Sequence, residues 1–223
     1  MRRAAVLLIG LSTLVGSRVA RGDTGADLAA LTAGLPACDP ARAHCIGIHL
    51  HVPLGGDGAI AKADWLAVEL AAANRHFAPL GVGFQVVGSD ALPEAASHIA
   101  TRRERDAVSD GRLTGKVIHV FITGQLDDVD EPNGFIRGVT WHLRGSDRKY
   151  VILSTVAPDR VLAHELGHVF GLPHSKYAIS IMNKTDRAEP PPEQRTFADE
   201  ELAAMRPVLK RLLRDQVISD VAR

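Results

Sequence analysis

The stretch from His164 to His174 reads HELGHVFGLPH, and its spacing decides what the rest of the chain has to build. Residues four apart lie one turn apart on the same face of an α-helix, so the imidazoles of His164 and His168 can reach one metal ion. Glu165 lies beside that face but not between the histidines. This position suits a residue that contacts a water molecule on the metal rather than the metal itself.

The residues that follow predict how the helix ends. Gly171 can adopt a left-handed conformation without steric conflict, and Pro173 prevents the helix from resuming. His174 is therefore free to turn back as a third ligand. Three neutral imidazoles with one open position suit catalytic zinc, which lowers the pKa of its bound water to about 7. The opposite side of the helix is apolar and is expected to pack on a sheet; it comprises Leu162, Leu166, Val169 and Phe170.

His164 to His174 resembles the extended zinc motif HExxHxxGxxH of the metzincin metallopeptidases at all five fixed positions. Eight residues later, Ser180-Ile181-Met182-Asn183 resembles the turn containing methionine, the Met-turn, that runs beneath the zinc in that family. The spacing is most similar to matrixin-type members. The resemblance implies an α+β fold with a mixed twisted sheet, an active-site helix, a C-terminal helix and two subdomains around a cleft. It also implies that an extended peptide pairs with an edge strand, which we expect at residues 138–142.

The expected activity is hydrolysis of peptide bonds by a zinc-dependent endopeptidase, with Glu165 as general base and one Zn²⁺ on the three histidines. A non-catalytic zinc-binding or adhesion module of the same fold is the alternative, although a purely structural site has no need of Glu165. A thermolysin-like site with Glu189 or Glu193 as third ligand is disfavoured, because the adjacent prolines make a helix there improbable.

The amino terminus has the pattern of a secretory signal peptide over residues 1–22, with cleavage between residues 17 and 22. An uncleaved anchor is the alternative. We therefore expect a secreted or periplasmic protein with an N-terminal segment over residues 23–45 and a catalytic domain over residues 46–223. Lys plus Arg and Asp plus Glu both number 26. This balance does not suggest nucleic acid or a membrane surface as a partner, and we expect a monomer that acts on a peptide or protein.

The two cysteines, Cys38 and Cys45, are predicted to form a disulfide in an exported chain. So short a loop contributes roughly 2–3 kcal/mol in the chain-entropy model, so it would pin the N-terminal segment rather than hold the whole fold. An inhibitory cysteine that ligates zinc in a latent form is the alternative reading.

Hydrophobic periodicity predicts the remaining elements. Strands are expected at residues 46–52, 82–87, 117–122, 138–142 and 150–153, and a core-packing helix at 63–77. The zinc helix is expected to begin near Pro158, and a C-terminal helix is expected after a capping box of Thr196 and Asp199.

Two further groups of polar residues remain open in their interpretation. The acidic cluster at residues 127–131 can supply oxygens to Ca²⁺, but a solvated loop is the simpler reading. His49 and His51 share one strand face and can bind metal, although we expect a solvent-exposed polar face. Residues 127–147 show no clear pattern of His and Asp for a second, structural zinc of the matrixin type.

Overall fold

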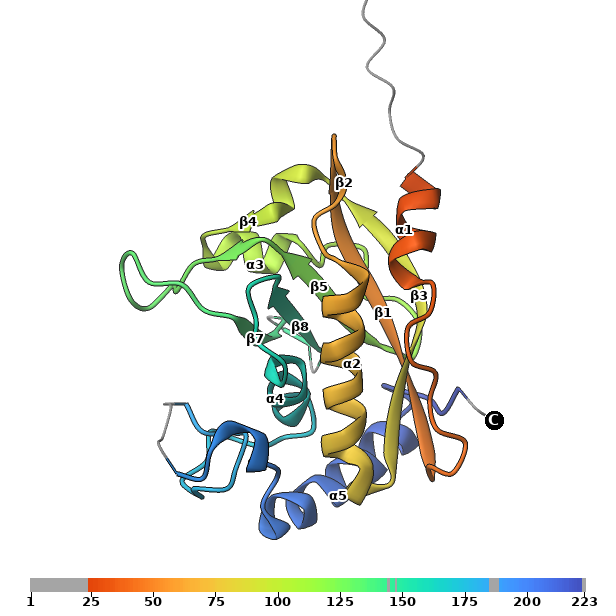
Figure 1. Ribbon diagram of the computed structural model, residues 1–223, viewed down its shortest axis with the longest axis vertical. Helices are drawn as coiled ribbons and strands as arrows, with labels where there is room; N and C mark the ends of the chain where they lie inside the picture. The colour runs from red at the N-terminus through yellow and green to blue at the C-terminus, as the bar shows by residue number, and fades with distance from the viewer. Residues whose placement is uncertain (1–23, 144, 147, 185–188, 222–223) are drawn as a thin grey trace, which may run out of the picture.

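The computed structural model describes residues 24–143, 145–146, 148–184 and 189–221, and the predicted signal peptide lies outside these residues. A twisted mixed sheet runs through the middle of the protein (Figure 1), with strand order β2-β1-β5-β8-β7 and with β3 paired to β1. Its strands are β1 (His44–Gly55), β2 (Gly58–Ala59), β3 (Val82–Leu92), β5 (Ile118–Thr123), β7 (Gly138–His142) and β8 (Lys149–Ser154).

Four of the strands run parallel, whereas the short strand β2 and the edge strand β7 each run antiparallel to their neighbour. β3, β1, β5 and β8 pair in parallel, whereas β7 pairs with β8 antiparallel through contacts such as Val139 opposite Ile152. β7 has the bounds predicted from the sequence and forms one edge of the sheet. β5 and β8 are buried along almost their whole length, which explains their continuous apolar sequences.

Two helices cover one face of the sheet. α2 (Ala63–Phe77) and α4 (Val161–Val169) pack against each other there, and α4 also contacts β7 and β8. The alternating residues of β1 belong to the core beneath these helices, and they are Ile46, Ile48, Leu50 and Val52. The period-two pattern therefore identified the correct inward face, although β1 is longer than predicted.

The opposite face of the sheet carries a smaller apolar cluster that includes Phe121, Tyr150 and Ile152. Short elements close over it, and Tyr150 donates a hydrogen bond to the carbonyl of Arg105 at 2.5 Å. These elements are η2 (Glu94–Ser97), β4 (His98–Ile99), α3 (Arg102–Ala107) and β6 (Gln125–Leu126). α3 is a capped helix, with Thr101 and Glu104 forming a capping box.

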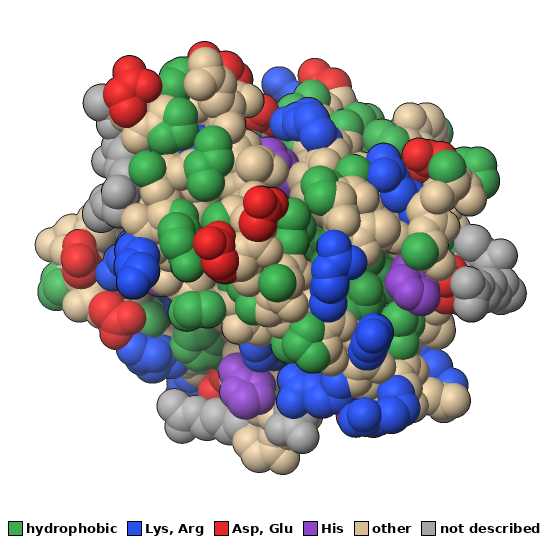
Figure 2. Space-filling view, turned by 90° about the horizontal axis from the view of Figure 1, so that it is seen from below, with side chains coloured by type: hydrophobic (Ala, Val, Ile, Leu, Met, Phe, Trp, Pro, Cys, Tyr) green, Lys and Arg blue, Asp and Glu red, His purple; other side chains and the backbone are tan. Residues whose placement is uncertain are grey.

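The carboxyl-terminal helix α5 (Asp199–Arg214) lies at the bottom of the molecule in Figure 1, next to η1 (Ala78–Leu80). The view from below shows many Lys and Arg side chains, with hydrophobic side chains scattered between them (Figure 2). The predicted capping box is wrong in its residues: α5 begins at Asp199, and Glu201 accepts a hydrogen bond from the backbone nitrogen of Ala198 at 2.8 Å. Thr196 instead pairs with Ser180 in a short parallel bridge. The remaining short helix is η3 (Pro192–Gln194).

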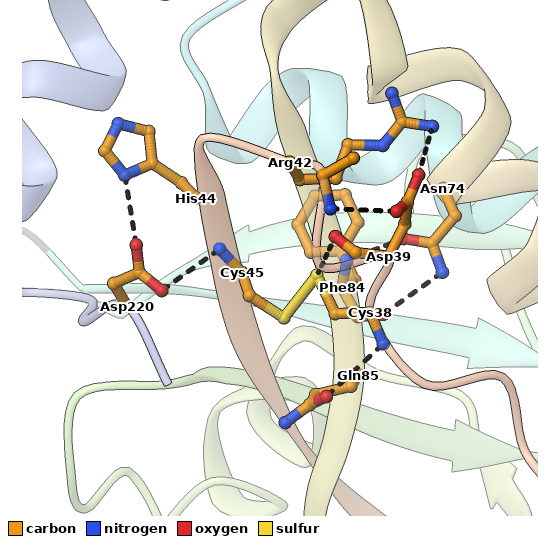
Figure 3. Close-up of a disulfide and its surroundings, with 10 residues drawn as sticks. Cys38, Asp39, Arg42, His44, Cys45, Asn74, Phe84, Gln85 and Asp220 are labelled. Atoms are coloured by element: carbon orange, nitrogen blue, oxygen red, sulfur yellow. Dashed lines mark hydrogen bonds and ion pairs between the residues drawn. A yellow bond between two sulfur atoms is a disulfide. The ribbon is translucent and has the colours of Figure 1, made fainter. Parts of the chain in front are cut away.

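The N-terminal segment is tied to the same core. Helix α1 (Thr24–Thr32) buries Leu28 and Leu31 in it. Cys38 and Cys45 form a disulfide, and the backbone nitrogen of Cys38 donates to the side-chain oxygen of Gln85 on β3 (Figure 3). The disulfide therefore pins the chain beside β1 and β3, as expected. None of the described helices has the length and apolar character needed to cross a membrane.

Candidate metal centre and active site

The two histidines of α4 face each other across one helical turn. Their Nε2 atoms lie 3.2 Å apart, and the ring centroids of His164 and His168 are separated by 4.8 Å at an interplanar angle of 83°. α4 begins at Val161, three residues later than predicted, because Arg160 has φ 115° and cannot be helical. In the first turn of this helix, the backbone nitrogen of Leu162 donates a hydrogen bond to Glu69 of α2 at 2.9 Å.

Backbone carbonyls determine which nitrogen of each imidazole is free. His164 Nδ1 lies 2.7 Å from the carbonyl oxygen of Ile181, and His168 Nδ1 lies 2.7 Å from that of Leu172. A carbonyl only accepts hydrogen bonds, so both Nδ1 atoms carry the hydrogen and both Nε2 atoms keep a bare lone pair. Burial lowers the pKa of both rings, that of His168 to about 4, so the imidazoles are neutral. Two bare lone pairs thus point at one position.

His174 joins this pair from the segment that follows the helix. Gly171 has φ 93° and ends the helix as expected, and the ring of His174 then lies 5.5 Å from that of His164 and 4.9 Å from that of His168. Ligand atoms of the three histidines lie within 4.8 Å of one another. The structure therefore brings together the three histidines that the sequence spacing selected.

Glu165 lies next to this group and is almost completely buried. Burial raises the pKa of its carboxyl group to about 7, against the opposing effect of hydrogen bonds from Thr140. The hydroxyl oxygen of Thr140 is 2.9 Å from Glu165 Oε2 and 2.6 Å from the Glu165 carbonyl oxygen. A Cβ at Gly138 would come within 3.1 Å of Glu165 Cγ, so the bare backbone of β7 makes room for this carboxylate.

Met182, the predicted Met-turn residue, packs against Gly167 of α4. Its side chain is fully buried, and a Cβ at Gly167 would come within 2.5 Å of its sulfur, so the glycine of the motif permits close packing on the turn. The turn is held by Ser180, whose hydroxyl lies 2.8 Å from both carboxylate oxygens of Glu201 and accepts a hydrogen bond from the backbone nitrogen of Met182. This link to α5 holds the carbonyl of Ile181 against His164.

Two adjoining hollows meet at Glu165 and His164. One, of about 470 Å³, lies beside the start of α4 and includes Arg137, Arg160 and Lys184 in its lining. The other, of about 570 Å³, follows β7 across the three histidines and includes Asp128 and Asp130. Gly138, His164 and Glu165 line both hollows, so a long ligand can pass the carboxylate from one hollow to the other.

The structure does not support two interpretations made from the sequence, one for His49 and His51 and one for the acidic loop. His51 is fully buried and His49 is three-quarters buried, so their strand face is not the solvent-exposed polar face that we expected. Calcium in the acidic loop is not supported: Asp127 pairs with His98 and Asp130 with Arg102, and the loop forms no metal-ligand group among the described residues. A solvated acidic loop is the better description.

Sequence reasoning missed the residues that hold the site in place. Thr140, Glu69, Ser180 and Glu201 all act across 20 or more positions of sequence. Of these, Ser180 had a positional signal in the predicted Met-turn, and Thr140 had one on the predicted edge strand. Its contact with Glu165 depends on how that strand sits over α4, which no local pattern encodes.

Comparison with known proteins agrees with this geometry. The matrixin family model matches residues 115–205, the part of the chain that runs from just before β5 into α5 and contains all three histidines. No curated protein sequence matches the chain significantly.

Solved structures share the fold at low identity. Archaemetzincin from Methanopyrus kandleri aligns with a TM-score of 0.50 and 18% identity, over 78% of this chain and 100% of that one. Metalloproteinase-II from Bacteroides fragilis aligns with a TM-score of 0.51 and 15% identity, over 83% of this chain and 60% of that one. The family match and the shared fold are consistent with a metzincin-type metallopeptidase. They confirm the predicted resemblance and the α+β fold with its mixed twisted sheet.

Proposed function

We propose that this chain is a secreted zinc-dependent endopeptidase in which His164, His168 and His174 hold one zinc ion and Glu165 is the general base. The observation that carries the proposal is the pair of unprotonated Nε2 atoms of His164 and His168, which lie 3.2 Å apart. The buried carboxylate of Glu165 lies beside them, next to the edge strand β7. The matrixin match supports the metallopeptidase class.

The donor set fits zinc. Three neutral imidazoles leave an open position, and two of them are oriented by backbone carbonyls, as is usual for metal-bound histidine. A zinc ion bound there supplies Lewis acidity, which makes water acidic near neutral pH and polarises a peptide carbonyl.

Glu165 transfers the proton of the attacking water. Thr140 holds Oε2, so Oε1 is the atom that receives a proton from the attacking water and later delivers it to the leaving amine nitrogen. The burial of the carboxyl group keeps bulk water from competing for that proton. Because the backbone at Gly138 passes directly over the carboxylate, a peptide lying along β7 would present its carbonyl carbon within reach of that water.

The open edge of β7 supports cleavage within a chain rather than at its end. The hollows extend on both sides of Glu165, so a peptide can continue in both directions. They differ in charge: Glu165 is the single acidic side chain among the described residues that line the first hollow, where the basic residues are Arg137, Arg160, Lys184 and Arg195. We infer a preference for acidic or polar substrate side chains on that side of the cut.

Export rests on the signal-peptide pattern of residues 1–22, and the disulfide between Cys38 and Cys45 is compatible with an extracellular location. The alternative is a zinc-binding module without activity. The buried, oriented Glu165 favours the enzyme, because a module that only binds metal gains nothing from a carboxylate held next to the open position.

The test is cleavage of a diverse set of peptides with blocked amino and carboxyl ends by the mature, zinc-loaded protein. Cleavage that a chelator abolishes and added zinc restores, with cut sites inside the peptides, supports the proposal. The same digests show whether acidic residues are enriched on one side of the cut. A protein that binds one zinc ion at the histidines and cuts none of the peptides would be the non-catalytic module.

A further inference from the structure

A second group of metal-ligating side chains lies on the other face of the sheet and shares no residue with the site on α4. His49 and His51 on β1 lie in register with Gly88 and Asp90 on β3. On the other side of β1, His119 of β5 lies opposite His49. A register shift after Ile48 aligns the two strands in this way. Sheet register therefore brings three histidines and one aspartate onto the same patch of the sheet, across a sequence separation of about 70 residues.

A chain of hydrogen bonds determines which nitrogen atoms are free. His119 Nε2 lies 2.8 Å from the carbonyl oxygen of Thr114, so it carries the hydrogen and His119 Nδ1 is a bare acceptor. His51 Nε2, 2.9 Å from that acceptor, therefore donates to it. It follows that His51 Nδ1 keeps an unprotonated lone pair. This atom is buried and has no hydrogen-bond partner in the described part of the chain.

That unused lone pair faces a carboxylate. His51 Nδ1 is 3.8 Å from Asp90 Oδ2, too far for a hydrogen bond, and His49 Nε2 is 2.9 Å from the same oxygen. All three atoms lie within 4.8 Å of one another. A buried acceptor without a donor is unfavourable, and an acceptor that faces a carboxylate is more so. A cation among the three atoms removes both penalties.

The surroundings are shaped to this group. A Cβ at Gly88 would come within 2.8 Å of His49 Nδ1, so the glycine leaves space for this imidazole beside β3. The ring of His51 stacks on Phe121 at 4.2 Å between centroids and cannot turn away freely. Asp90 is 55% exposed and His49 is 26% exposed, so an ion can enter from solvent on their side.

We propose that His49 Nε2, His51 Nδ1 and Asp90 Oδ2 bind a second divalent transition-metal ion, with Zn²⁺ as the expected ion, and that His119 orients His51 for this purpose. Two imidazoles and one carboxylate are ligands that zinc accepts, and water completes the coordination on the exposed side. His119 donates a hydrogen bond to the Thr114 carbonyl and accepts one from His51. Metal-bound histidines are commonly oriented by a hydrogen bond of this kind on the nitrogen that does not bind the metal. The ion joins β1 to β3, the strand beside the disulfide, and so stabilises this side of the sheet.

The test is zinc stoichiometry, which does not depend on activity. The mature protein is stripped with a chelator and titrated with Zn²⁺ in competition with a chromophoric chelator. We expect two equivalents per chain for the wild type. Asp90→Asn and His49→Gln should each weaken one equivalent by about 10-fold or more, and they should reduce the rise in melting temperature that zinc produces. Both residues are partly exposed, so these variants avoid the folding risk of a change at the buried His51.

Matched variants separate this site from the first one. His98→Gln removes an exposed histidine that also pairs with an aspartate, Asp127 at 3.0 Å, but has no third ligand among the described residues, and it should leave both equivalents unchanged. His174→Ala should weaken the other equivalent only. A wild-type chain that takes up a single equivalent, which His174→Ala abolishes, would overturn the second site and leave the proposed function intact. So would two equivalents that neither Asp90→Asn nor His49→Gln affects.

Discussion

The hydroxyl oxygen of Thr140 on β7 lies 2.9 Å from Glu165 Oε2 on α4, and this contact connects the edge strand to the carboxylate of the proposed active site. The same hydroxyl is 2.6 Å from the backbone carbonyl oxygen of Glu165. Thr140 thus positions both the side chain and the backbone of one residue. A single edge strand thereby aligns the carboxylate with the place where a peptide would lie.

Thr140→Val keeps the shape of the side chain and removes the hydroxyl. We expect kcat to fall by about 10-fold, the equivalent of one net hydrogen bond, while zinc stoichiometry and KM stay close to those of the wild type. Thr140→Ser restores the hydroxyl and should recover most of the rate. Steady-state kinetics on a quenched peptide and metal analysis give the answer. Full turnover in the valine variant would show that Glu165 needs no positioning from β7.

Substitutions of Glu165 and of His174 should have different effects on zinc binding and on turnover. Glu165→Gln is expected to keep one zinc ion at the histidines and to reduce turnover by about 10² to 10⁴, the range associated with loss of a positioned general base. His174→Ala should instead weaken zinc binding, since two imidazoles hold the ion less well than three, and activity should follow zinc occupancy.

Metal content after dialysis and peptide hydrolysis are the two measurements for this pair. His142→Ala is the matched control, because His142 lines the same hollow but lies outside the three-histidine group. It should leave zinc content unchanged. An active Glu165→Gln enzyme would place the base elsewhere, whereas full zinc content in His174→Ala would argue against the third ligand.

Only alternate residues of β7 can bind a peptide backbone. Arg137 accepts a hydrogen bond from Ser154 and Leu143 donates one to Arg148, so the odd-numbered residues of this segment bond to β8. Gly138, Thr140 and His142 therefore turn their backbone groups away from β8, and the backbone of Thr140 also hydrogen-bonds to the Glu165 carboxylate. Substitution by proline at Val139 would damage the sheet itself and is a poor test of substrate binding.

N-methylated substrates test the edge without changing the protein. Methylation of an amide nitrogen that pairs with β7 should lower kcat/KM by about 10-fold, whereas methylation of the next amide, which points away, should have a much smaller effect. A series of peptides with the methyl group moved one residue at a time supplies its own control. The absence of any alternation would show that substrate does not bind β7 as an added strand.

Glu69 predicts an unusual dependence of stability on pH. Its carboxyl group is fully buried, Oε2 accepts the backbone N–H of Leu162, and Oε1 has no partner in the described structure. Burial raises the pKa of Glu69 from its ordinary value of 4.5 to about 8. The folded state therefore holds the proton more tightly than the unfolded chain, and this contribution is fully present below pH 4.5 and is lost as pH rises through 8.

Glu69→Gln imitates the protonated form at every pH. Relative to the wild type, its free energy of unfolding should rise between pH 5 and pH 8, by on the order of 3 to 5 kcal/mol. Urea unfolding of both metal-free proteins at several pH values measures this difference, and the titration of the histidines cancels in it. A difference that stays constant across this range would mean that Glu69 is ionised in the folded protein.

The features that depend on a single helical turn could be predicted from the sequence. His164 and His168 meet because residues four apart share a helix face, and Gly171 and Pro173 end the helix so that His174 can return. The inward face of β1 followed in the same way from its period of two. These features depend on backbone geometry over a few residues, so they can be predicted from one amino-acid sequence.

The residues that support the two candidate metal sites could be identified only from the tertiary structure. The start of α4 depends on Arg160 and on Glu69 from a distant helix, and the turn at Met182 depends on Ser180 and Glu201. The burial of His51 depends on the register of β1 with two parallel neighbours. Parallel strands are joined by long connections, so a change of register leaves each strand's own pattern intact and changes every contact between strands. For this reason His49 and His51 suggested a polar surface in the sequence and form part of a candidate metal site in the folded protein.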